Sequence, residues 1–343
     1  MTGPPTFHSE RSGSVEPAGG KTADPVTRVD RNGFVYRTKF KRWESRAAVR
    51  AKPRRVLDEE REDGKLFFPP ELVPVALHPV VAERGAAVVD AVLLQRLHVY
   101  LDFTAELEQM SINPVTQRIS RRKVGFAVPE PMVEDAYKIC TDEAWHAQFS
   151  DDLQRQLVVA TGIPPTVPDE PQFFRRLREM EAEAPVEIAG LPGIFFAIVS
   201  ETLISAILSD IPRDERVVTA VRELVDDHAE DEGRHHAFFS KFFDCIWPQL
   251  SARQRRLLGP FLPRLVLAFL EPDYDALASI LSRSGLSDDD VRRVIEEAHP
   301  HDEVVADIRR TSRATLRLFH EHDILDDPGT LEAFSASGLL GAT

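Results

Sequence analysis

Two short strings in this chain share one spacing of metal-binding residue types, a glutamate followed three residues later by a histidine. They are EAWH, from Glu143 to His146, and EGRH, from Glu232 to His235. Residues three and four apart lie on one face of an α-helix, so each string presents a carboxylate and an imidazole together. A further histidine, His228, lies one turn before Glu232 on the same face. Each string can therefore direct several ligands toward one site.

Two more glutamates lie on apolar helix faces outside these strings. Glu108 shares a stripe with Leu97 and Leu101, and Glu201 is the only charged residue between positions 191 and 208. An ionised carboxylate among apolar neighbours is costly unless its charge is compensated. The order along the chain is also repeated: a lone Glu, a Glu-x-x-His helix, a second lone Glu and a second Glu-x-x-His helix.

Four carboxylates directed into one interior would repel each other, and bound cations would remove that repulsion. Helical bundles that hold two iron or manganese ions use this set, a Glu from each of two helices and Glu-x-x-His from each of the other two. Taken singly, each residue could still be an ordinary core histidine or a surface glutamate. Taken together they predict a buried site for two metal ions. The predicted ligands are Glu108, Glu143, His146, Glu201, His228, Glu232 and His235.

The segments that position these residues have helical periodicity nearly throughout, with proline and glycine mostly between them. Within the predicted helices, Asp142, Glu106 and Glu230 are expected to point toward solvent. No run of alternating residues predicts a strand, so we expect an all-α fold with a four-helix bundle core and peripheral helices. The long helices are expected at 79–112, 129–161, 187–210 and 212–246, and shorter ones at 171–183, 251–270, 288–298 and 302–322.

Composition and the ends of the chain limit the choice of compartment and partner. The net charge of −14 argues against nucleic acid and anionic membranes as partners. Two cysteines and no apolar leader segment favour the cytoplasm. Residues 1–30 are expected to form a disordered tail and 31–343 a single helical domain. The basic strings KFKRW, at 39–43, and KPRR, at 52–55, are expected to be solvated.

The metal-ligand pattern resembles the ferritin-like superfamily, and its third histidine narrows the resemblance. The arrangement H-x-x-x-E-x-x-H, together with LHVYLDFTAELEQMSINPVT and TDEAWHA, resembles the AurF-type arylamine N-oxygenases over about residues 80–245. That family holds two iron ions, cycling between Fe²⁺ and Fe³⁺, and uses O2 to oxidise an aromatic amine to hydroxylamine, nitroso and nitro products. The resemblance thus implies an amine substrate from natural-product (antibiotic) biosynthesis, an external electron donor and a possible homodimer.

The resemblance also implies a division of the ligands between the two irons. Glu143 and Glu232 would bridge them. The first iron would take Glu108 and His146, and the second Glu201, His228 and His235.

The substrate pocket is less defined by the sequence. Tyr100 and Thr104 share the stripe of Glu108 and are candidates to line the pocket, although simple core packing is the favoured explanation for both. A substrate carboxylate would need a buried cation. Arg309 or Arg310 could supply it, since the nearest arginine before Glu108 is Arg96.

Two other functions remain open from the sequence, a di-iron C–H hydroxylase or desaturase and a non-enzymatic metal-binding helical protein. A ribonucleotide reductase subunit is disfavoured. That family has a radical tyrosine four residues after the first motif histidine, where this chain has Ser150.

Overall fold

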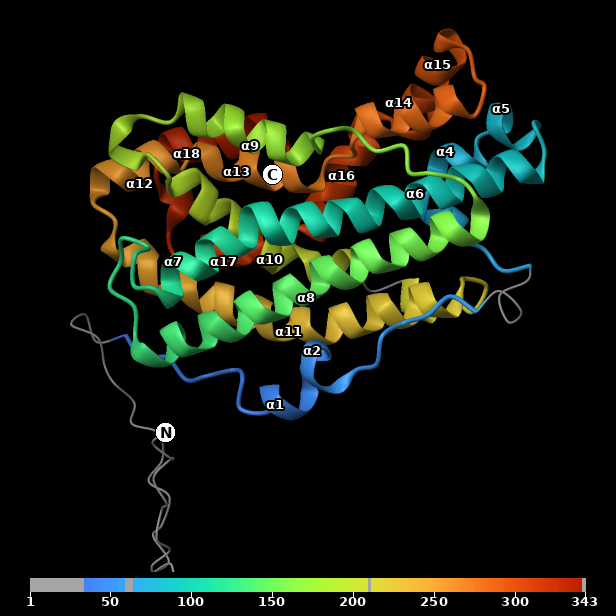
Figure 1. Cartoon of the computed structure of the whole chain (residues 1–343). Helices are drawn as coiled ribbons and strands as arrows, with labels where there is room; N and C mark the ends of the chain where they lie inside the picture. Colours follow the sequence, from blue (N-terminus) through green and yellow to red (C-terminus); the bar gives the residue numbers. More distant parts are fainter. Residues whose placement is uncertain (1–33, 59–63, 209–210, 341–343) are drawn as a thin grey trace, which may run out of the picture.

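Four long helices form the centre of the molecule (Figure 1). The computed structural model describes residues 34–58, 64–208 and 211–340, so the predicted tail at 1–30 lies outside the described residues. Helix α6 packs against α8, α8 against α11, and α11 against α10. Among the described residues there is no β-strand, only an isolated bridge between Leu66 and Val217. The all-α bundle prediction is confirmed. The four helices are α6 (Ala86–Leu107), α8 (Glu130–Thr161), α10 (Leu191–Ile207) and α11 (Thr219–Ile246).

Three of the long helices begin later than predicted, α10 by four residues and α6 and α11 by seven each. Gly85 has φ of 100°, a conformation that favours glycine, and it separates α5 (Pro79–Ala82) from α6. The segment before α11 forms only a short 3₁₀ turn, Ile211–Arg213. In both places the proline at the predicted start, Pro79 or Pro212, lies in a short helical turn, and the long helix begins only after a break in the backbone.

A π-helical turn, Glu108–Ile112, follows α6 directly and leads into α7 (Asn113–Ser120). The backbone N–H of Asn113 donates to the carbonyl oxygen of Glu108, five residues earlier. Pro114 follows at once and has no N–H to donate, so a regular helix would leave a carbonyl without its partner here. The widened turn begins at Glu108, which is a predicted metal ligand. π-Helical turns often occur at functional sites.

Shorter helices cover the bundle on two sides. Helices α1 (Trp43–Arg46) and α2 (Ala48–Ala51) lie on the side formed by α8 and α11, where α2 contacts both. On the opposite side, α10 is covered by α9 (Gln172–Glu183), α13 (Phe261–Leu270) and α17 (Arg313–Glu321). The bundle interior is thus separated from solvent by a second layer of structure.

The remaining C-terminal segments are more divided than predicted. The helix predicted at 251–270 is interrupted at Gly259 and Pro260, and the one at 302–322 is interrupted at Ser312. Two further helices, at Tyr274–Arg283 and Pro328–Ala336, were not predicted, although both contain buried apolar residues. The elements not yet described are α4 (Pro74–Leu77), α12 (Ala252–Leu258), α14 (Tyr274–Arg283), α15 (Asp288–Ala298), α16 (His301–Thr311) and α18 (Pro328–Ala336).

Helix α10 was the most membrane-like segment in the sequence. It is 17 residues long, and the side chains described along it are nearly all buried against the surrounding helices. No helix in the described parts of the chain has the length and apolar character needed to cross a bilayer.

Candidate metal centre

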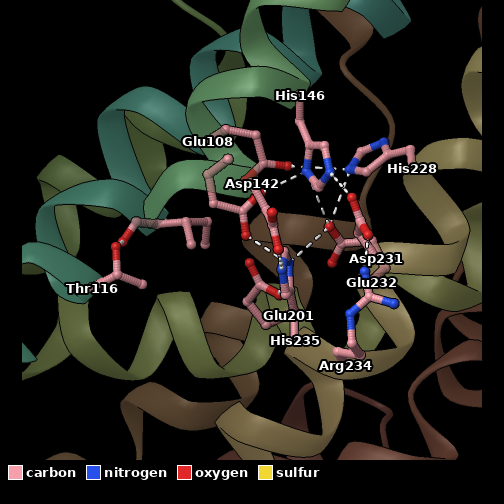
Figure 2. A network of polar contacts seen from close by, with 12 residues as sticks. Glu108, Thr116, Asp142, His146, Glu201, His228, Asp231, Glu232, Arg234 and His235 are labelled. Atoms are coloured by element: carbon pink, nitrogen blue, oxygen red, sulfur yellow. Dashed lines mark hydrogen bonds and ion pairs between the residues drawn. The ribbon is translucent and has the colours of Figure 1, made fainter. Parts of the chain in front are cut away.

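The seven predicted side chains converge on one place inside the bundle (Figure 2). The π-helical turn after α6 contributes one glutamate, α8 a glutamate and a histidine, α10 one glutamate, and α11 the other three residues. None of the seven is more than 2% exposed. Their potential ligand atoms form three overlapping groups, and within each group all these atoms lie within 4.8 Å of one another. The groups are Glu108, His146, His228 and Glu232; Glu143, His146, Glu232 and His235; and Glu108, Glu143 and Glu201.

His228 lies at the Glu108 end of the cluster. Its Nε2 is 3.5 Å from Oε1 of Glu108 and 3.2 Å from Oε1 of Glu232, and its ring centroid is 4.4 Å from that of His146. This differs from the division implied by the resemblance, which grouped His228 with Glu201 and His235. His228 and His235 are seven residues apart on α11, about 10 Å along the helix axis. They therefore face opposite ends of the cluster.

The other end of the cluster is formed around His235. Its Nδ1 lies 2.7 Å from Oε1 of Glu143, 3.2 Å from Oε1 of Glu232 and 4.0 Å from Oε2 of Glu201. Glu143 also contacts Nδ1 of His146 at 2.7 Å, and Glu232 lies 3.5 Å from the same nitrogen. Glu143 and Glu232 thus occupy the middle of the cluster, with access to both ends.

Two aspartates that the sequence reasoning missed hold the second nitrogen of two histidines. Nε2 of His235 is 3.2 Å from Oδ2 of Asp142, and Nε2 of His146 is 3.1 Å from Oδ2 of Asp231. Asp142, predicted to face solvent, is fully buried. That prediction was wrong because a helical wheel shows the core stripe of one helix but not which neighbours cover its flank. The missed signal is the doublet Asp-Glu in both strings, D-E-x-x-H.

The aspartates are held in turn by the N-terminal segment. The indole Nε1–H of Trp43 donates to both carboxylate oxygens of Asp142, at 2.8 and 2.9 Å. The backbone N–H of Ala48 donates to Asp231 at 3.0 Å, and Arg234 pairs with the same carboxylate. In the basic string KFKRW the charged side chains are exposed as expected, but Trp43 is buried. This segment therefore supports the candidate site rather than forming only a solvated face.

We expect Asp142→Asn or Asp231→Asn to lower metal affinity about 10- to 100-fold, because hydrogen-bond partners of ligating histidines orient them and raise their basicity. Competition with a coloured chelator would measure the affinity. Asp226→Asn, at an exposed position on α11, is the matched control and should change nothing. Wild-type affinity in both variants would show that the aspartates have no such role.

Protons and cations compete for the buried carboxylates and imidazoles of the cluster. Burial raises the pKa of Glu108 to about 8, and the charge of Glu143 adds to the shift. Burial also raises the pKa of Glu201 well above its usual value, with help from Glu232 and Glu143. For His235, burial lowers the pKa, but the charges of Glu143 and Glu232 outweigh it and raise the pKa. Metal binding must displace these protons.

The donor atoms fit a metal centre. Buried polar atoms nearly always have hydrogen-bond partners. Here Oε2 of Glu108, Oε2 of Glu201, both carboxylate oxygens of Glu232 and Nδ1 of His235 are buried and form no hydrogen bond with the described residues, although close ionic contacts join Glu232 and His235. Several such exceptions therefore lie where the seven side chains meet, and others lie elsewhere among the described residues. A mixed carboxylate and imidazole set suits iron and related divalent ions.

Comparison with known proteins agrees with this geometry. The model of the family described as p-aminobenzoate N-oxygenase AurF matches residues 42–323. The chain belongs to the AurF family. Among curated relatives, a 4-aminobenzoate N-oxygenase of Streptomyces thioluteus is 26% identical over 282 residues, which cover 80% of this chain and 79% of the relative.

Membership of the AurF family confirms the predicted resemblance and extends it. The matched region contains all seven cluster residues and also reaches Trp43 and Ala48, which lie before the segment that carried the predicted resemblance. Membership favours an N-oxygenase over the hydroxylase, desaturase and non-enzymatic alternatives.

The predicted substrate residues lie in two different places. Tyr100 and Thr104 are buried on α6, and the hydroxyl of Tyr100 has no hydrogen-bond partner among the described residues. The Thr104 hydroxyl donates to the carbonyl oxygen of Tyr100 at 3.1 Å. Arg309 and Arg310 instead line a cavity beside α16 and α17, whose lining includes none of the seven cluster residues.

Proposed function

We propose that this protein is a di-iron N-oxygenase that uses O2 to oxidise an aromatic amine. The observation that carries the proposal is the buried set of four glutamates and three histidines in a chain of the AurF family. Two bound iron ions would supply the activation of O2 and the redox chemistry. Glu143 and Glu232 would bridge them, Glu108, His146 and His228 would complete one end, and Glu201 and His235 the other.

Aromatic rings protect the proposed centre from water. The ring of Phe149 lies 5.3 Å from that of His146 and 5.8 Å from that of His228. Phe40 stacks on His235 with centroids 6.0 Å apart. Water exclusion strengthens electrostatic interactions within a site and prevents side reactions. These rings therefore support a role in redox chemistry on a bound substrate.

The substrate class that we propose is an amine of the aminobenzoate type, on the basis of the relative's name. A carboxylate on such a substrate calls for a cation, and Arg96 on α6 is the candidate. It is partly buried, lies 5.2 Å from the ring of Phe68, and forms no ion pair among the residues that the structure describes. Tyr100, one turn further along α6, interacts electrostatically with both Arg96 and Glu108. Arg96 could therefore hold the carboxylate while the amine points toward the metals.

We expect Arg96→Gln to raise KM for 4-aminobenzoate by at least about tenfold, the effect of losing one hydrogen bond to a charged group. Oxidation of aniline, which has no carboxylate, should change little, and Arg96→Lys should recover part of the loss. Steady-state kinetics measure both substrates. Arg118→Gln, at an exposed arginine of α7, is the control. An equal loss for aniline and 4-aminobenzoate would argue against a carboxylate contact.

The proposed function is tested with the purified protein. We expect close to two iron ions per chain after loading with Fe²⁺, and conversion of 4-aminobenzoate to N-oxygenated products when the reduced protein meets O2. Mass spectrometry identifies the products. Failure to bind iron, or oxidation only of C–H bonds in any amine supplied, would refute the proposal.

A further inference from the structure

An arginine-rich face lies on the C-terminal helices α16 and α17. Figure 1 shows where these two helices lie in the molecule. From position 309 to 320 the chain contains four arginines and a histidine but no acidic residue, although the net charge of the whole chain is −14. All five basic side chains line one cavity of about 840 Å³. They are Arg309, Arg310, Arg313, Arg317 and His320.

Two of these arginines, Arg313 and Arg317, are available to an incoming anion, whereas the other two already have partners. Arg309 donates to the carbonyl oxygen of Gly338 at 3.0 Å, and Arg310 pairs with Asp307 at 2.9 Å. Arg313 and Arg317 are exposed, and neither forms an ion pair or hydrogen bond within the described part of the chain. Buried apolar side chains such as Phe319 and Phe334 form the floor of the cavity. One acidic side chain, Glu321, also lines the cavity, but the arginines outnumber it. The face is therefore positive at its rim and suited to an acidic partner.

The same helix is in direct contact with the bundle helix that carries Glu201. Thr315 lies between Arg313 and Arg317 but on the opposite face of α17, and its Oγ1 is 2.9 Å from Oγ1 of Thr202. Both threonines are buried, and Thr202 directly follows Glu201 on α10. Packed helix axes are about 8–10 Å apart. The arginine-rich face is therefore about one helix layer outside the candidate metal centre.

We propose that this face docks a small acidic electron-transfer protein of the plant-type [2Fe–2S] ferredoxin kind, which delivers electrons to the centre across α17 and α10. This inference rests on the proposed function, which needs electrons that the amine does not supply in its first step. Oxidation of RNH2 by O2 to RNHOH and H2O consumes two electrons and two protons. Two reduced carriers supply the electrons, one each, and are left oxidised, and solvent supplies the protons. A second copy of this chain is a less suitable partner, because it would not supply the electrons that the reaction consumes.

The first test measures binding and does not depend on iron in this protein. Calorimetry with oxidised plant-type ferredoxin at low salt should give a dissociation constant that is at least about tenfold weaker for Arg313→Glu/Arg317→Glu than for the wild type. High salt should weaken wild-type binding as well. Arg292→Glu/Arg293→Glu on α15 introduces the same change in net charge at two other exposed arginines, and it should bind like the wild type.

The second test measures electron delivery to the iron-loaded protein. The Arg313→Glu/Arg317→Glu variant should accept electrons more slowly from reduced ferredoxin, followed by its visible absorbance, but at the wild-type rate from reduced methyl viologen. Equal ferredoxin binding by wild type and variant would overturn the inference. So would a variant that elutes as a smaller oligomer with unchanged ferredoxin binding, because the face would then join copies of this chain. A different result would count against the proposed function and not against the docking face. In that case ferredoxin would bind, but neither ferredoxin nor methyl viologen would support amine oxidation.

Discussion

Replacing Glu232 by glutamine should remove most of the bound metal and reduce amine oxidation to background. Glu232 lies in the middle of the cluster, with Oε1 3.2 Å from His228, 3.2 Å from His235 and 3.5 Å from His146. Glutamine keeps the volume but loses the negative charge and places N–H donors among metal ions. Loss of an outer hydrogen-bond partner of a ligand already costs about 10- to 100-fold in affinity or activity, so loss of a central carboxylate should cost more.

Glu230→Gln is the matched control for this experiment. It makes the same change on the same helix, two residues away, but at an exposed side chain that pairs with Lys52 on the surface. Metal per chain is measured by mass spectrometry of the eluted ions and activity by product formation. Full metal content and turnover in the Glu232 variant, or equal losses in both variants, would contradict a bridging role for Glu232.

Metal loading should raise the melting temperature by about ten degrees or more. A ligand that binds only the folded state at a thousand times its Kd stabilises by about 4 kcal/mol per site. One kcal/mol shifts the melting temperature of a domain of a few hundred residues by about 2–4 °C. The physical reason in this chain is that carboxylate atoms of Glu108, Glu201 and Glu232 are buried and form no hydrogen bond with the described residues.

Scanning calorimetry of the chelator-treated and the iron-loaded protein measures this shift. The increase should shrink as the pH falls, because the raised pKa of His235 and of Glu201 means that protons compete with metal for these atoms. The Glu232→Gln variant should show little increase at any pH. Identical melting temperatures with and without iron in the wild type would show that the cluster does not hold metal.

Much of the candidate site could be predicted from the sequence because its geometry is local. The spacing from Glu143 to His146, and from His228 through Glu232 to His235, determines which side chains share a helix face in any fold that keeps the helices. The isolated charge of Glu201 within an apolar segment marked it as a residue that needed compensation. The repeated order of these residues then predicted a four-helix arrangement, and all seven side chains do converge.

The position of each ligand within the cluster depends on how the helices pack. His228 lies with Glu108 and His146 because α11 passes the end of α6 at that height, which no spacing within α11 reveals. The π turn that begins at Glu108 depends on the chain's path around Pro114 and was likewise not predicted. Only the assembled bundle determines which residues share an end of the site.

The sequence by itself determined the fold class, the identity of the seven clustered residues and the family, since each depends on residue types at short spacing. Only the tertiary structure decided what surrounds them. Trp43 reaches Asp142 from 99 residues away, and Asp142 was assigned to solvent until that contact was known. A helical wheel describes one helix, whereas burial on its flank depends on distant segments that pack there. The support of the histidines is therefore a property of the fold rather than of any one motif.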